Sequence, residues 1–410
     1  MRAGLCSWLV ARPFRAGIEG TPMRNVFLLT AGFAIAATTV TAQVPAKIES
    51  ELMKIGQIVD PACTAKLYRP LMPATDFNTY WPPDASSPKS TTPLYPGVTI
   101  VRDQSFGPNA KDVLDIFQGE KGGDKRPVVI YVPGGAGNKI EQQVRESNAF
   151  YDNIGRWATK NGMVGVLVQR HPGSGNWDDG GRDLSQAVDW IHDNIAKYKG
   201  DPNHMVIWAH SAGNGPLGVY IGHADRWKNG VQVKGAIFMS GNPVPGVGGA
   251  PGGGAGRGGP GGPGAPQPGV ACGLTGASMT SNVGKISGPS GFDVPAPGAG
   301  RGGPGGPGGP GRGGPQLTAE QQAERDNLPG FMKSNAKIAL AYAEWDPGVM
   351  NAQMPANTVA LHDEMCKVGK DHCPALWMLK GESHMSEVFS LDTSDQVVAK
   401  PVLDFVKKSK

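Results

Sequence analysis

Apolar residues along the chain fall into short runs that alternate with helical patterns. Val128 to Val132 is a continuous β-branched and aromatic run, typical of a strand buried on both faces of a parallel sheet. Apolar positions from Arg182 to Tyr198 keep the spacing of one helical face. Further strands are expected at 164–169, 205–209, 234–239, 336–342 and 375–379. The alternation predicts an α/β fold in which helices cover both faces of a mostly parallel sheet.

A segment between two of these strands has a different composition. Residues 245–268 and 296–315 are dominated by glycine and proline, and the sequence GRGGPGGPG occurs twice, at 256–264 and 300–308. Such a composition cannot bury a core, so 245–315 is predicted to be a disordered insertion. A mobile lid and a tolerated expansion without function are both open interpretations. Regular structure is expected to resume near Thr318, whose hydroxyl and Gln321 fit a capping box that opens a short helix.

The strand at 205–209 ends abruptly in His210-Ser211-Ala212-Gly213. A serine on a sharp turn from strand to helix holds its Oγ clear of the sheet, and small neighbours let a base and a substrate approach it. Ser211 is therefore the predicted nucleophile. The first glycine of the G-x-S-x-G pattern is Ala209 in this chain, so the motif alone is only moderately specific.

An acidic and an imidazole side chain follow two later strands. The apolar run at 338–342 leads into Glu344-Trp345-Asp346, and the run at 375–379 leads into His384. The order Ser, Asp, His differs from the orders in trypsin-like and subtilisin-like proteases and matches the order found in α/β hydrolases. Asp346 would hold His384 in one tautomer, and His384 would take the Ser211 proton and return it to the leaving group. Glu344 is the alternative third member.

The region from Asp103 to Lys410 resembles the α/β-hydrolase superfamily, and within it the carboxylesterase and acetyl-esterase branch related to hormone-sensitive lipase. The matching blocks are 112–117, the Gly134-Gly135 loop, 181–183, 200–202, 210–213 and the Asp346 and His384 segments. The resemblance implies an α/β-hydrolase fold and an acyl-enzyme mechanism that needs neither a metal nor an organic cofactor.

The same resemblance implies an oxyanion hole. Its backbone N–H donors fall on Gly135, Ala136 and Ala212, and Gly134 would substitute if the loop shifts. This chain departs from the family at two places. The family's His-Gly-Gly-Gly begins with Pro133 here, which removes a side chain that usually orders the loop, and the nucleophile motif begins with Ala209.

The first 42 residues have the pattern of an export leader. Met23-Arg24-Asn25 precedes an apolar stretch at 26–37, and residues 40–42 are small, as a signal peptidase requires. Met23 is the expected true start, and the stretch is short for a membrane anchor. Cleavage after Ala42 would remove four arginines and one glutamate and lower the formal charge from +4 to +1. The remaining chain has no basic field for nucleic acid or an anionic membrane.

The exported part divides into an N-terminal extension at 43–95, expected to wrap the catalytic domain, and the catalytic domain itself at 96–410. It keeps four of the five cysteines, and an even number in an exported chain predicts disulfides. Cys366 and Cys373 are the favoured pair. His362, Cys366, His372 and Cys373 are close in sequence, but their spacing does not match a zinc site, so no metal is expected.

The sequence thus predicts a periplasmic or secreted serine esterase that acts on a small-molecule ester, without a nucleic-acid partner or stable membrane insertion. The triad fixes acyl transfer and leaves the leaving group open, so an amidase, formamidase or peptidase is an alternative. A hydrolase-fold protein used for binding, with the insertion as its interaction element, is another. The acyl chain, the alcohol and the oligomeric state are not encoded in any pattern of this sequence.

Overall fold

The computed structural model describes residues 43–72, 95–135, 151–169, 176–244, 317–347 and 354–410. One eight-stranded sheet in the order β1-β2-β4-β3-β5-β6-β7-β8 forms its centre. The strands are β1 Val98–Ser105, β2 Val113–Gly119, β3 Arg126–Val132, β4 Val164–Val168, β5 Gly200–His210, β6 Gly235–Met239, β7 Lys337–Trp345 and β8 Ala375–Ser383.

The sheet is mostly parallel, as predicted. β2 runs antiparallel to β1 and β4, and every neighbouring pair from β4 to β8 is parallel. The expected strands are all present, but β7 and β8 continue to Trp345 and Ser383, beyond their predicted ends at 342 and 379. The two strands stay paired past a register shift between Ala343 and Trp345, where polar side chains interrupt the apolar pattern. The structure therefore brings Asp346 and His384 directly to adjacent strand ends.

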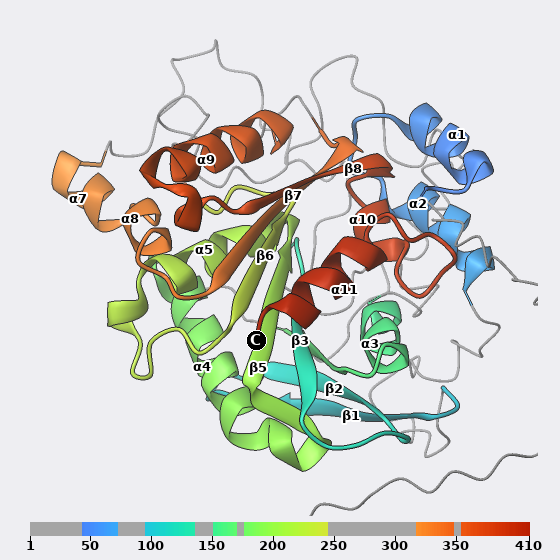
Figure 1. Cartoon of the computed structure of the whole chain (residues 1–410), viewed down its shortest axis with the longest axis horizontal. Helices are drawn as coiled ribbons and strands as arrows, with labels where there is room; N and C mark the ends of the chain where they lie inside the picture. The colour runs from blue at the N-terminus through green and yellow to red at the C-terminus, as the bar shows by residue number, and fades with distance from the viewer. Residues whose placement is uncertain (1–42, 73–94, 136–150, 170–175, 245–316, 348–353) are drawn as a thin grey trace, which may run out of the picture. The chain divides into compact units, whose positions relative to one another are not determined.

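Helices cover both faces of the sheet (Figure 1). Val129 and Tyr131 of β3 point into one core with α3 and α11, whereas Val128 and Ile130 point into the other with α4, α5, α8 and α9. This alternation follows from the two-residue period of a strand. The helices are α3 Asp152–Lys160, α4 Asp179–Asn194, α5 Asn214–Gly222, α8 Leu328–Phe331, α9 Met354–Val368, α10 Ser386–Phe389 and α11 Ala399–Lys408. The fold class predicted from the sequence is confirmed.

Two local predictions can be compared with the structure. The helix expected over 182–198 begins at Asp179 and becomes a 3₁₀ turn, Ile195–Tyr198, in its last residues. Thr318 and Gln321 form the expected capping box at the start of α7, Ala319–Glu324. The leader at 1–42 and the insertion at 245–315 lie outside the described residues.

Residues 43–72 of the predicted N-terminal extension pack onto the sheet and its helices. α1 Ala46–Ile55 buries Ile48, Leu52 and Ile55, which share one helical face, and it lies against β8. α2 Pro61–Tyr68 lies against α10, the short helix that follows His384. Both helices join the core that contains α3 and α11. The extension therefore reaches the segment that carries the histidine.

The cysteines in the described residues are all disulfide-bonded. A disulfide joins Cys366 near the end of α9 to Cys373 just before β8, the pair that the sequence favoured. Cys63 of α2 is also disulfide-bonded. Among the helices that the structure describes, none combines the length and apolar character needed to cross a bilayer.

Candidate active site

Ser211 occupies a strained turn at the carboxyl end of β5. It begins a 3₁₀ turn, Ser211–Gly213, and α5 follows at once. Its φ of +53° lies in the left-handed region, which a residue other than glycine rarely adopts. The Nδ2 of Asn214 donates to the carbonyl oxygens of Ser211 and Met239, both at 2.8 Å, and so ties the turn to the end of β6. Ser211 is partly exposed, whereas His210 is buried.

Two glycines are needed for the close approach of other chain segments to this turn. A Cβ at Gly134 would lie 2.7 Å from the Ser211 Cβ, and one at Gly213 would lie 2.7 Å from the Val132 carbonyl oxygen. Ala209, which stands where the motif has glycine, is fully buried among apolar side chains on the α4 face of the sheet. Its Cβ points into the core rather than toward the nucleophile, so the departure from the motif leaves the turn unobstructed.

Ser211, His384 and Asp346 form a continuous hydrogen-bonded line. His384 Nε2 lies 2.9 Å from Ser211 Oγ, and His384 Nδ1 lies 2.8 Å from Asp346 Oδ1. Because an ionised carboxylate only accepts hydrogen bonds, Nδ1 carries the proton and Nε2 is the acceptor for the serine hydroxyl. His384 and Asp346 are buried. The geometry gives Ser211 a base and gives that base an orienting carboxylate.

Glu344, the alternative acid, has a different partner. Its Oε2 accepts the N–H of Gly381 at 2.7 Å and so links the ends of β7 and β8. Asp346 Oδ2 accepts the N–H of Ala343 at 2.9 Å, which fixes the carboxylate that faces His384. Asp346 is therefore the residue that contacts the imidazole.

The three predicted oxyanion donors differ in how far the structure describes them. Gly135 is exposed, has a φ of +56° and follows Gly134, the residue packed against Ser211. Ala212 is exposed and directly follows Ser211. Ala136 lies outside the described residues. Gly135 and Ala212 thus border the serine from β3 and β5, respectively.

Buried polar residues beneath the triad were missed from the sequence. Ser240 Oγ, at the end of β6, is hydrogen-bonded to Asp346 Oδ2 and, at 2.7 Å, to Glu387 Oε1 of α10. The Nε2 of His210 donates to the carbonyl oxygen of His384 at 2.8 Å. Burial, reinforced by the neighbouring His384, lowers the pKa of His210 well below its ordinary value. His210 is therefore neutral and supports the main chain of the catalytic turn.

A second buried acid lies two residues before His384. Glu382 and Ser386 are hydrogen-bonded, and Ser386 Oγ accepts the N–H of Ser383 at 2.7 Å. Tyr68 of α2 donates to Asp395 Oδ2 at 3.0 Å. Burial, followed by the charge of Asp395, raises the pKa of Glu382 well above its ordinary value. Their positions, Glu382 two residues before and Glu387 three residues after the predicted catalytic histidine, are the signal that could have drawn attention to these acids in the sequence.

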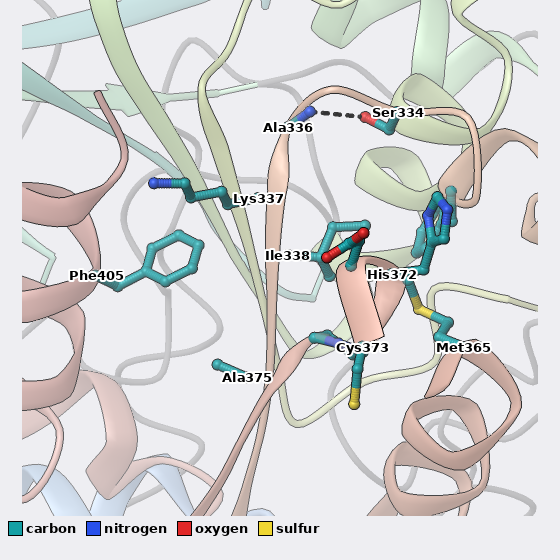
Figure 2. Close-up of a pocket in the computed structure, with 12 residues that line it drawn as sticks. Ser334, Ala336, Lys337, Ile338, Met365, His372, Cys373, Ala375 and Phe405 are labelled. Carbon is teal, nitrogen blue, oxygen red and sulfur yellow. Dashed lines mark hydrogen bonds between the residues drawn. The ribbon is translucent and has the colours of Figure 1, made fainter. Parts of the chain in front are cut away.

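A pocket of about 260 Å³ lies elsewhere in the molecule (Figure 2). Lys337 and Ala375, the first residues of β7 and β8, line it together with Met365, Cys373 and Phe405. These strands are parallel, and the triad is at their carboxyl ends. The pocket therefore lies at the opposite edge of the sheet, and its lining residues do not include Ser211, His384 or Asp346.

Comparisons with known proteins find sequence similarity to lipases and carboxylesterases over part of the chain. The BD-FAE family model matches residues 114–229, which include Ser211. The secreted triacylglycerol lipase LIP1 of Gibberella zeae is 31% identical over 147 residues, which are 31% of this chain and 24% of the lipase. Carboxylesterase 1E of Mus musculus is 30% identical over 110 residues, which are 24% of this chain and 18% of that enzyme. The chain thus spans about a quarter or less of the length of these curated relatives.

Among solved structures, carboxyl esterase 2 of Tuber melanosporum aligns with 80% of this chain and 90% of its own, at 15% identity and a TM-score of 0.47. The order and direction of the strands and the turn that places Ser211 after β5 match the fold predicted from the sequence. The chain thus has an α/β-hydrolase fold and, over part of its length, is similar in sequence to lipases and carboxylesterases.

Proposed function

We propose that the protein is a serine hydrolase that cleaves carboxylic esters, with Ser211, His384 and Asp346 as its catalytic triad. The proposal is carried by the line from Ser211 Oγ through His384 to Asp346, with distances of 2.9 and 2.8 Å. The strained, partly exposed position of Ser211 supports it, because strain of this kind is retained where it serves a reaction. The lipases and carboxylesterase among the sequence matches support esters as the substrate class.

In this mechanism Ser211 Oγ attacks the ester carbonyl carbon while its proton passes to His384 Nε2. The carbonyl π electrons move to the oxygen, which the N–H groups of Gly135, Ala136 and Ala212 would stabilise. Collapse of the tetrahedral intermediate breaks the bond to the alcohol oxygen, which takes the proton from His384. Water then attacks the acyl carbon and gives a proton to His384 Nε2. The bond from the acyl carbon to Ser211 Oγ breaks, Oγ takes that proton from His384, and the carboxylic acid leaves. Asp346 stabilises the imidazolium in both halves of the reaction.

The substrate proposed is a small-molecule ester, and the compartment is the periplasm or the exterior of the cell. The leader pattern at 1–42 and the disulfide between Cys366 and Cys373 support export, and one matched relative is itself named a secreted lipase. No step of the proposed chemistry draws on a metal or an organic cofactor.

The test combines a covalent probe with a substrate panel. A fluorophosphonate should label the protein on Ser211, and acyl esters of short and long chain should be hydrolysed faster than the matching amides. Ser211→Ala should lower ester hydrolysis by a factor on the order of 10⁴ or more and abolish labelling. If Ser211→Ala kept more than about a tenth of the activity, the assignment would be wrong.

A further inference from the structure

Two buried carboxyl groups share one serine hydroxyl beneath the triad. Ser240 Oγ contacts Asp346 Oδ2 and Glu387 Oε1, and all three side chains are fully buried. A hydroxyl has a single proton, so it donates to one carboxyl group and must accept from the other. One of the two acids is therefore protonated.

The surroundings decide which acid holds this proton. Asp346 accepts hydrogen bonds from His384 Nδ1 and from the N–H of Ala343, and both favour its charged form. Glu387 Oε2 has no hydrogen-bond donor within the described residues. It lies 3.3 Å from His210 Nε2, but that nitrogen directs its hydrogen to the His384 carbonyl at 2.8 Å. Glu387 is consequently the neutral member.

The surroundings of Ser240 hold its backbone in an unfavourable conformation. Ser240 has a φ of +47°, and its N–H donates to the Ala341 carbonyl oxygen at 2.9 Å. A left-handed serine directly after a strand is unfavourable unless its surroundings hold it there. Here the conformation directs the hydroxyl between the two acids.

We propose that Glu387, as a neutral carboxylic acid, and Ser240 are positioning residues that hold the Asp346 carboxylate against His384 Nδ1. Glu387 donates to Ser240 Oγ, Ser240 donates to Asp346 Oδ2, and Asp346 Oδ1 accepts from His384 Nδ1. This inference rests on the proposed function, since it assigns a role in the same triad. In this arrangement Asp346 carries the single negative charge of the hydrogen-bonded chain, and it faces the imidazolium that forms on His384 during the reaction.

Five polar or charged residues face Glu387. They are His210 of β5, Ser240 after β6, Asp346 after β7, Glu382 of β8 and His384, whose ring nitrogen lies within 4.8 Å of a Glu387 oxygen. Burial and the charge of Asp346 both raise the pKa of Glu387 well above its ordinary value. A second negative charge at Glu387 would stabilise the imidazolium form of His384 and thereby move the acid limb of the activity profile to higher pH.

The test compares Glu387→Gln with Glu387→Ala. Glutamine keeps a neutral donor to Ser240 and alanine removes it. We expect Glu387→Ala and Ser240→Ala to lower kcat on the order of 10-fold to 100-fold with KM changed by less than about 2-fold. Glu387→Gln should restore most of that loss and leave the acid limb of kcat/KM, which reports His384, at the wild-type pH. Glu364→Gln, an exposed change on α9, is the matched control for converting a carboxyl to an amide.

Two results would overturn the inference. A shift of the acid limb of Glu387→Gln to lower pH by about one unit or more would show that Glu387 is charged in the native enzyme. Wild-type kcat in Glu387→Ala would show that the group positions nothing. If Glu387→Ala did not fold, the acid limb of Glu387→Gln would decide alone, read from the pH dependence of fluorophosphonate labelling. Failure of the proposed function is distinguishable, because wild-type protein would then show neither labelling nor ester hydrolysis.

Discussion

The position of Ser211, the proposed nucleophile, depends on the absence of a side chain at Gly134. Gly134 contacts Ser211 so closely that even one added methyl group has no room: its carbon would lie 2.7 Å from the Ser211 Cβ and 3.3 Å from Oγ. The loop after β3 therefore sets the position of the hydroxyl, independently of any oxyanion donor that the same loop provides.

Gly134→Ala is predicted to impair catalysis without unfolding the protein. The methyl group would push Ser211 or the loop by several tenths of an ångström, and misplacement on the order of 1 Å costs about 10²-fold in rate. Steady-state kinetics on a short-chain ester would measure the loss. Gly215→Ala is the control, because a Cβ at Gly215 meets nothing within 4 Å. Equal activities of the two variants would show that the loop moves freely.

Ala209 allows a complementary prediction. Because its Cβ is buried among apolar side chains, Ala209→Gly should lower the free energy of unfolding by about 1 kcal/mol through lost packing and a more flexible unfolded chain. Ester hydrolysis should stay within about twofold of wild type, since this methyl group points away from Ser211. Urea denaturation and a kinetic assay test the two parts. A tenfold gain in activity would show instead that alanine hinders the nucleophile turn.

Among the secondary-structure elements, the central strands and the residues at their ends were predictable because apolar periodicity reports burial. Ser211, Asp346 and His384 each come after a predicted strand and directly follow the observed one, and parallel strands bring such residues to one edge. Ser240 and Glu387 could not be identified in this way. Their hydrogen bond depends on how α10 packs against β8, and a glutamate in a sequence is normally a sign of exposure. Because polar side chains usually indicate exposure, the predicted ends of β7 and β8 were also placed several residues too early.

The disulfide between α9 and β8 is predicted to stabilise the fold without affecting catalysis. Cys366 and Cys373 close a small loop at the amino end of β8, whereas the triad lies at the carboxyl end. Replacing both by serine should lower the free energy of unfolding by about 2 to 3 kcal/mol and leave kcat near that of wild type. Urea denaturation measures the first effect. Free thiols at both positions in a non-reduced peptide map of exported protein would contradict the premise.

Across the whole described molecule, a buried acidic cluster connects the N-terminal extension with the catalytic turn. Tyr68 of α2 donates to Asp395, and Glu382 lies beside Ser386, just after His384. Tyr68 also lies 3.5 Å from Glu382. The extension therefore contributes a hydrogen bond to the group of residues that supports the histidine, although more than 300 residues separate them in sequence.

This cluster should make the stability of the protein decrease as pH rises. The pKa of Glu382 is raised in the folded state by burial and by Asp395, whereas a glutamate in the unfolded chain titrates near about 4.3. Above that pH the unfolded chain releases a proton that the folded protein retains. The contribution of Glu382 is thus complete at low pH and is lost as pH rises toward its folded-state pKa.

Glu382→Gln removes this titration, so its free energy of unfolding should rise relative to wild type between about pH 5 and pH 8, by at most about 1.4 kcal/mol per pH unit. His210 acts in the opposite sense, because burial lowers its pKa and its contribution to stability is lost as pH falls. Both proteins contain His210, so its contribution cancels in the difference between their free energies of unfolding. Urea denaturation at matched pH values measures the difference, with Glu364→Gln as the exposed control. A difference that is flat with pH would mean that Glu382 is ionised in the folded protein, and that the carboxyl group of Asp395 holds the shared proton.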